Sequence, residues 1–210
     1  CFPWLVEKAR FIPFGTDSVF FDFAEEPACE EKSIVCVGYK KRDWDTLIAA
    51  YQKFAKEAEG KEIPFLHLIG SDDSGVSKDV ELPKGAKIVT TPYIPIDELI
   101  LQIRKALFCV LPLEEFNYSY GQMTLLQQMA LGKAVITSAV SGVIDYVQDG
   151  QNALCYQTGN VEELREKMTL LYQDEALRKT LGAQAAEYVK HAYNEEKMAL
   201  KIEEYLKELA

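Results

Sequence analysis

A single glycine stands between a buried strand and an apolar helix near the middle of the chain. The strand covers Phe108 to Leu113, Gly121 occupies the turn, and the helix runs from Gln122 to Leu131. Glycine permits unusual backbone angles and a close approach of ligand, and the first amides of a helix lack intrahelical partners. Together with the helix dipole, this arrangement is typical of a phosphate site at the carboxyl edge of a parallel sheet. The donors would be the amides of Gln122, Met123 and Thr124.

The other polar residues indicate no second kind of chemistry. His67 lies inside an apolar strand and is interpreted as a core residue, and His191 lies near a helix junction without partners at metal-binding spacing. The chain has no Ser-His-Asp arrangement. We therefore predict no bound metal. Two interpretations of Gly121 remain open: it belongs to a phosphate site, or it only forms a tight connection between strand and helix.

Strands and helices alternate along the chain from residue 33 onward. The strands are continuous apolar runs, which indicates cover on both faces and therefore a parallel sheet with helices on each side. We predict a doubly wound parallel sheet, an α/β fold of Rossmann-like type. The predicted strands are 33–38, 65–70, 87–91, 108–113, 134–138 and 153–157. The predicted helices are 44–60, 96–106, 122–131, 143–149, a helical region from 161 with a turn at 173–174, and 195–209.

The composition excludes some partners and compartments. A formal net charge of −10 argues against nucleic acid as the main partner, although a few local donors can still bind a small anion. Of five cysteines, Cys36, Cys109 and Cys155 lie in apolar strands, so we interpret them as reduced core residues, with a disulfide as the less favoured alternative. No apolar run reaches the roughly 20 residues that cross a bilayer, and the N-terminus lacks a signal-peptide pattern. Because it begins with Cys, we expect a piece of a longer cytoplasmic protein.

Five segments in order resemble a known family of enzymes. The chain resembles the C-terminal, nucleotide-sugar-binding half of GT-B glycosyltransferases, in particular the retaining group called family 4. Each segment alone is common among α/β proteins, so the resemblance depends on their order and spacing. The segments are IPFGTDSVFF, VGYKKRDWDTLIAAY, FLHLIGSDD, LPLEEFNYSYGQMTLLQQMALGKAVI and SAVSGVIDYVQDGQNALCYQTGNVEELREKMTLLYQD.

The resemblance implies a two-domain enzyme with its reaction in the cleft between the domains, of which this sequence supplies one. Residues 1–31 would form the interdomain linker, 32–192 the nucleotide-sugar-binding domain, and 193–210 a C-terminal helix that packs on a missing N-terminal domain. The substrate would be a nucleotide diphosphate sugar, with no other cofactor. A glycan, lipid or small-molecule acceptor would bind the missing half. The protein would be cytoplasmic, free or at the inner face of a membrane.

The resemblance also places a basic clamp for the diphosphate after the first strand. The family has Arg just after the glycine that ends this strand, here Gly38, but this chain has Tyr39 instead. The family's Lys position falls on Arg42, and Lys40 or Lys41 supplies a second charge. A guanidinium also pairs with phosphate oxygens, so Arg42 is the favoured ligand. A solvated surface turn is the alternative interpretation of these residues.

Two glutamates of the family, eight positions apart, are replaced in this chain by Ser119 and Gln127. The amide of Gln127 can still bind ribose hydroxyls, whereas Ser119, beside the transferred sugar in the family, offers no charge. Glu114 or Glu115 could swing into that space, or both could be surface residues. We take Ser119 and Glu115 as the catalytic candidates and leave open whether the chain is catalytically complete.

Two further loops and the last helix complete the expected site. Tyr93, in the loop after the third strand, is predicted either to stack on the nucleotide base or to serve packing. The turn at Ser141 and Gly142 resembles a family turn that faces the cleft. The last helix carries an apolar stripe that would either fold onto its own domain or remain exposed. This stripe consists of Met198, Ile202, Tyr205 and Leu206.

We therefore predict the donor-binding domain of a retaining glycosyltransferase of hexosyltransferase type, acting in polysaccharide biosynthesis and inactive as an isolated domain. The alternative is a non-catalytic GT-B-like subunit that binds a nucleotide or a partner protein, which the two replaced glutamates favour. A flavodoxin-like or receiver-like regulatory module is disfavoured, because no acidic cluster follows the first strand.

Overall fold

The centre of the molecule is one parallel sheet of six strands in the order β3-β2-β1-β4-β5-β6. The computed structural model describes residue 4 and residues 9–22, 30–38, 40–70 and 80–209, so Tyr39 and the predicted loop 71–79 lie outside the described residues. The chain winds outward from β1 in one direction and from β4 in the other, which confirms the doubly wound fold. The strands are β1 (Ser33–Val37), β2 (Phe65–Ile69), β3 (Ile88–Thr91), β4 (Phe108–Leu111), β5 (Val135–Ser138) and β6 (Leu154–Tyr156).

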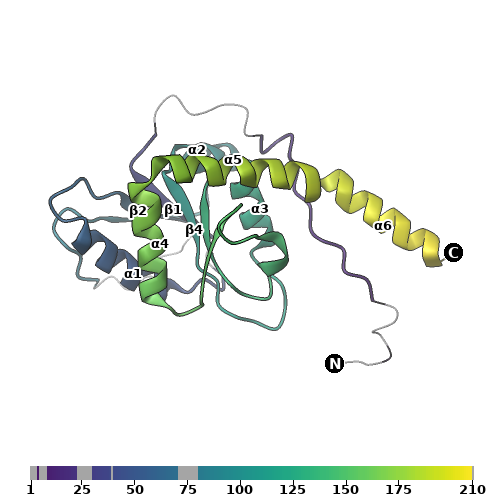
Figure 1. Cartoon of the computed structure of the whole chain (residues 1–210), viewed down its shortest axis with the longest axis horizontal. Coiled ribbons are helices and arrows are strands. Elements are labelled where there is room, and N and C mark those ends of the chain that lie inside the picture. The colour runs from purple at the N-terminus through teal and green to yellow at the C-terminus, as the bar shows by residue number, and fades with distance from the viewer. Residues whose placement is uncertain (1–3, 5–8, 23–29, 39, 71–79, 210) are drawn as a thin grey trace.

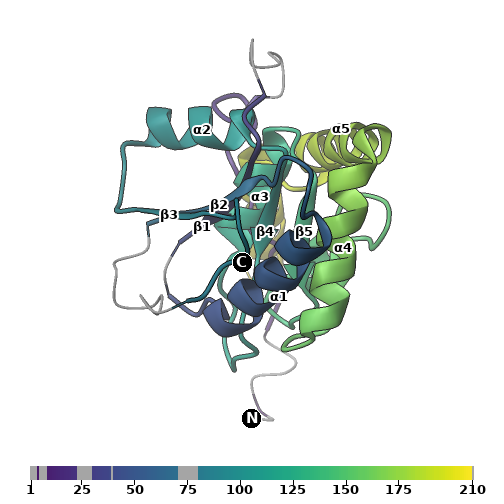
Figure 2. The ribbon, with the colours of Figure 1, turned by 90° about the vertical axis from the view of Figure 1, so that its left-hand side faces the viewer.

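Helices cover both faces of this sheet (Figure 1). One face is covered by α1 and α4, which lie side by side in Figure 2, and the other by α2, α3 and α5. The described helices include none with the length and apolar character that crossing a membrane requires. The helices are α1 (Trp44–Glu57), α2 (Ile96–Lys105), α3 (Gln122–Ala130), α4 (Val161–Gln173), α5 (Glu175–Ala192) and α6 (Glu195–Leu209). The predicted helix at 143–149 is a single 3₁₀ turn, η2 (Ile144–Tyr146).

Strand β1 shows why a central strand must be apolar throughout. Ile34 and Cys36 pack on the face covered by α1 and α4, whereas Val35 packs on the opposite face, which α2, α3 and α5 cover. Burying such a side chain contributes about 1.5–3 kcal/mol, so both faces hold the strand in place. Cys36, Cys109 and Cys155 are buried free thiols, as predicted, and burial raises the pKa of Cys36 and of Cys109 to about 12.

Strand β3 departs from the prediction that every strand is covered on both faces. Ile88 and Val89 are only half-buried, and Thr90 is exposed. The strand lies at the edge of the sheet, and its neighbouring helix α2 buries a single residue, Ile103. The prediction was wrong here because a short apolar run does not distinguish an edge strand from a central one.

The N-terminal segment lies beside the start of α6. The Thr16 N–H donates to the Tyr193 carbonyl at 2.9 Å, and the Glu195 N–H donates to the Thr16 carbonyl at 3.2 Å. Beyond this junction α6 continues away from the sheet (Figure 1). The predicted apolar stripe is partly covered: Met198 and Tyr205 are half-buried, whereas Ile202 and Leu206 are exposed. Packing of α6 on a further domain stays a prediction.

Candidate functional site

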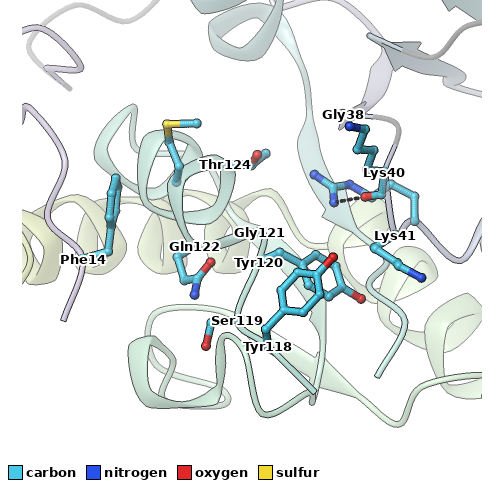
Figure 3. A pocket seen from close by; sticks show the side chains of 12 residues that line it. Phe14, Gly38, Lys40, Lys41, Tyr118, Ser119, Tyr120, Gly121, Gln122 and Thr124 are labelled. Atoms are coloured by element: carbon cyan, nitrogen blue, oxygen red, sulfur yellow. Dashed lines mark hydrogen bonds between the residues drawn. The ribbon is translucent and has the colours of Figure 1, made fainter. Parts of the chain in front are cut away.

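A pocket of about 630 Å³ opens at the carboxyl ends of β1 and β4, between the two halves of the sheet (Figure 3). Its walls come from the basic turn (residues 38 and 40–42), the aromatic loop (residues 114–120) and the first turn of α3. Ligands of open α/β sheets bind at this position. Of the predicted site residues, the pocket is lined by Gly38, Lys41, Arg42, Ser119, Gly121, Gln122, Met123 and Thr124.

Helix α3 begins at the pocket without a side-chain cap. Gly121 is its N-cap residue, with a left-handed φ of 90°, and it makes no side-chain hydrogen bond to the first turn. A side chain at this position would bring its Cβ to 2.9 Å from the Leu113 side chain. By contrast, α1, α4 and α5 each begin with an Asp or Asn that accepts a backbone N–H. The first-turn amides of α3 therefore face the pocket with the positive end of the dipole.

Arg42 lies inside the basic turn, not on its surface. Its side chain lines the pocket, but the residue is only 8% exposed. Its Nε donates to the Val37 carbonyl and its Nη1 to the Lys40 carbonyl, both at 3.0 Å. Gly38 makes room for it, because a Cβ there would lie 2.5 Å from Arg42 Nη2. Arg42 thus braces the turn with two of its donors, and burial lowers the pKa of its guanidinium.

Lys41 connects the basic turn to the aromatic loop. Its ammonium lies 4.0 Å from the centre of the Phe116 ring and 3.6 Å from the Glu114 carboxylate. Its backbone adopts a left-handed φ of 55°, which is unusual for a residue other than glycine, and its carbonyl accepts the Glu114 N–H at 3.3 Å. The Lys41 side chain is about one-third exposed and lines the pocket, so its ammonium remains within reach of an anion there.

The two catalytic candidates lie in different places. Ser119 is exposed and lines the pocket. Glu115 lies outside the lining, where its carboxylate accepts the Ser141 hydroxyl at 2.6 Å and the Ser141 N–H at 3.3 Å. These two hydrogen bonds lower the pKa of Glu115. They also fasten the aromatic loop to the turn after β5, where Gly142 lies against Tyr120.

Two predicted nucleoside ligands lie outside the pocket lining. Tyr93 is 88% exposed in the loop after β3, and Gln127 is half-buried on α3. Gln128, which follows Gln127 on α3, is fully buried. The side-chain amide of Gln128 has no hydrogen-bond partner among the described residues. His67 is a core residue, as predicted: its Nε2 pairs with the Thr91 hydroxyl at 2.7 Å, and burial lowers its pKa.

Three aromatic residues of the pocket were missed by the sequence analysis. Tyr118 and Tyr120 flank Ser119 and form a cluster with Phe116, whose ring centre lies 4.7 Å from that of Tyr118. Phe14 comes from the N-terminal segment, more than a hundred residues before Tyr118 in the sequence. The tyrosines could have been found from their place in the loop that contains Ser119. Phe14 carried no signal beyond its apolar neighbours.

Across residues 4, 9–22, 30–38, 40–70 and 80–209, no group of three or more His, Cys, Asp or Glu side chains is placed to hold a metal ion. The pocket offers hydrogen-bond donors, because backbone amides, ammonium groups and hydroxyls converge on it. Such a set of donors suits a phosphate or diphosphate group.

Comparison with known proteins identifies a family whose sequences this chain matches. The sequence model described as "Glycosyl transferases group 1" matches residues 31–174, which include the whole sheet and every pocket residue except Phe14. An uncharacterized glycosyltransferase of Methanocaldococcus jannaschii is 33% identical over 114 residues, which are 54% of this chain and 31% of that protein. The chain thus matches about a third of the length of this curated relative.

Solved structures share the fold. Sucrose-phosphate synthase from Thermosynechococcus elongatus aligns with a TM-score of 0.76 and 24% identity, over 99% of this chain and 55% of that one. The C-terminal domain of the glycosyl transferase group 1 family protein LpcC from Francisella tularensis aligns with a TM-score of 0.69 and 17% identity. That alignment covers 86% of this chain and 100% of that domain.

Proposed function

The chain belongs to the glycosyl transferases group 1 family, and from this premise we propose that it is the donor-binding part of an enzyme that transfers a sugar from a nucleotide diphosphate sugar. The C-terminal GT-B domain predicted from the sequence agrees with this membership. We further propose the retaining, family 4 mechanism and a glycan, lipid or small-molecule acceptor held by another part of the protein. Action in the cytoplasm, at a membrane surface for a lipid acceptor, belongs to the same proposal.

One observation carries the proposal: α3 begins uncapped at a pocket that also contains a cationic turn. In the proposed complex the diphosphate lies against the amides of Gln122, Met123 and Thr124, and the ammonium of Lys41 approaches it from the basic turn. These donors are fixed in place before the reaction, so they stabilise the charge that develops on the leaving diphosphate. Arg42 holds the basic turn in shape.

The remaining predicted residues keep their proposed roles around this centre. Ser119 would lie beside the transferred sugar, and Gln127 would approach the ribose. The loop at Tyr93 would lie against the base. Glu115 is proposed as a loop support instead of a reacting group, because its carboxylate accepts two hydrogen bonds from Ser141.

A specific observation favours a second candidate, a non-catalytic subunit that binds a nucleotide. None of the described residues that line the pocket has a carboxylate, since Ser119 occupies the candidate position and Glu115 points elsewhere. Such a pocket retains its phosphate donors and lacks a negative group to stabilise a positively charged transition state at the sugar.

Calorimetric titration of this chain with UDP, GDP and ADP tests the proposal. We expect saturable binding of one nucleotide, with loss of binding in Gly121→Asp and little change in Lys179→Ala, a control at an exposed side chain of α5 that does not line the pocket. Absence of binding by all three nucleotides in a folded sample contradicts the proposal. To separate the two candidates, the full-length protein is assayed for release of the nucleotide from its sugar conjugate, and binding without release supports the non-catalytic subunit.

A further inference from the structure

Phe14 reaches the pocket from a part of the chain that the proposed function has not used. Phe14 is 39% exposed and lines the pocket together with Gln122 and Met123. In Figure 3, Phe14 and the lysines of the basic turn lie on opposite sides of Gln122 and Gly121. The pocket therefore has a cationic end, a centre with helix amides, and an apolar end that Phe14 supplies.

The main chain at Phe14 is held by a buried tyrosine. The Phe14 N–H donates to the Tyr146 hydroxyl at 2.9 Å. Tyr146 belongs to η2 and is buried, and its ring centre lies 4.9 Å from that of Tyr193. Tyr193 in turn donates its hydroxyl to the Asp145 carbonyl at 2.8 Å. The position of Phe14 is thus fixed by the body of the domain.

The two residues after Phe14 fix it further. A Cβ at Gly15 would lie 2.3 Å from the Asn194 carbonyl oxygen, so only glycine allows this close approach of two main chains. Thr16 is paired with the junction of α5 and α6 by the hydrogen bonds described above. An exposed aromatic ring held by a rigid main chain is suited to contact a ligand, because little conformational entropy is lost on binding.

We propose that Phe14 contacts the sugar group of the nucleotide sugar and that Tyr146 is its positioning residue. This inference rests on the proposed function, in which the diphosphate lies at the amides of α3. Phe14 belongs to the segment predicted to lead into the acceptor-binding part. The transferred sugar must lie between the diphosphate and the acceptor, so the group next to Phe14 is the sugar and not the base. The ring of Phe14 and the side chain of Met123 then form an apolar wall against the carbon face of the sugar.

The experiment compares a nucleotide with its sugar conjugate. Wild type, Phe14→Ala, Phe14→Leu and Tyr146→Phe are titrated with UDP and UDP-glucose, with GDP and GDP-mannose, and with ADP and ADP-glucose. Phe11→Ala is the matched control, because Phe11 lies on the same segment, is 67% exposed and does not line the pocket. The readout is the ratio of the two affinities, which general destabilisation does not change.

For the nucleotide that binds, we expect Phe14→Ala to weaken the sugar conjugate about tenfold and to leave the bare nucleotide within about twofold. Phe14→Leu should recover part of the loss, Tyr146→Phe should lose about threefold for the conjugate alone, and Phe11→Ala should change neither affinity. An equal loss for nucleotide and conjugate overturns the inference, since it places Phe14 at the nucleoside. Unchanged affinities for both ligands also overturn it. If wild type binds no nucleotide at all, it is the proposed function that fails.

Discussion

The basic turn and the aromatic loop are built alike and end differently. Each follows a central strand, each leads into a helix, and both meet at the same pocket. The helix after the basic turn, α1, begins at Asp43, whose carboxylate accepts the Thr46 N–H at 3.1 Å. The helix after the aromatic loop, α3, begins at Gly121 with no such cap. The free positive end therefore belongs to α3 alone of these two.

The cationic side chains of the basic turn divide in a related way. Arg42 uses two of its donors on the turn's own carbonyls, so its charge serves the shape of the turn. Lys41, in the same turn, keeps its ammonium near the pocket and beside the Phe116 ring of the aromatic loop. The basic turn is thus stabilised from within by Arg42, whereas Lys41 and the first turn of α3 leave their donors for a ligand. Four variants test this division.

The largest effect is expected when α3 is given the kind of cap that α1 has. In Gly121→Asp a carboxylate occupies the proposed phosphate position, so repulsion should weaken nucleotide binding at least about a hundredfold. The uncharged control Gly121→Asn has the same size and the same strained φ, and it should lose about tenfold. Calorimetric titration measures both, after urea unfolding has shown that each variant is folded. A Gly121→Asp protein that binds like wild type refutes the anion site at α3.

Arg42→Met should remove the brace inside the basic turn. The Val37 and Lys40 carbonyls lose their donors, and we expect the free energy of unfolding to fall by about 2–3 kcal/mol. Urea denaturation measures the change. Lys41→Ala, which removes a neighbouring and partly exposed cation, should cost less than about 1 kcal/mol. Equal stability of Arg42→Met and wild type would mean that Arg42 is no brace and is free to serve as the phosphate ligand.

Asp43→Ala should lower stability without touching the ligand. Loss of the α1 cap is expected to cost about 1 kcal/mol in the free energy of unfolding, and nucleotide affinity should stay unchanged. Asp43→Ser, which can still accept the Thr46 N–H, is the matched control and should retain most of the stability. A fall in affinity with Asp43→Ala would show that α1 takes part in binding after all.

The smallest effect concerns pH and the attachment of the aromatic loop. The pKa of Glu115 is lowered, first by the Ser141 hydroxyl, so its bonds stabilise the fold above the ordinary pKa of 4.5. That contribution is lost as the pH falls through the lowered pKa. The small stability difference between wild type and Ser141→Ala should therefore be full at about pH 6 and shrink toward pH 3. A difference that is constant over this range contradicts the assignment, and Glu115→Gln serves as the variant without titration.

The fold was predictable because its signals are local. The apolar runs of β1 and β4 and the Gly stop after α3 fix element type within a few residues, and the predicted bounds agree with the structure within three residues for every element. The one difference in type is η2, a 3₁₀ turn where a short helix was predicted. The cover of β3 was not predictable, since it depends on how closely α2 packs. That packing is decided by contacts between segments and not by the run of residues itself.

The same distinction applies to the site: residues that a local segment positions could be predicted, and residues that contacts between distant segments position could not. Gly121 and the first turn of α3, the predicted phosphate site, line the pocket because one short strand–turn–helix unit positions them. The brace role of Arg42 depends on carbonyls of a loop conformation that no spacing reveals. Two adjacent glutamines differ by the helix rotation alone: Gln127 is half-buried, whereas Gln128 is enclosed. The place of Phe14 at the pocket could not be predicted, because it depends on the pairing of Thr16 with Tyr193. That pairing joins residues from opposite ends of the chain.

The strand order also has a consequence for synthesis of the chain. Strands β1, β2 and β3 are neighbours in sequence and can pair soon after they leave the ribosome. The other edge of β1 pairs with β4, where Ile34 lies opposite Phe108, so it stays unpaired until β4 has been synthesised. Until then a nascent chain presents an apolar strand with unpaired backbone groups, the kind of edge that associates with other chains. The yield of folded protein is therefore expected to depend on how long this edge stays unpaired before β4 is synthesised.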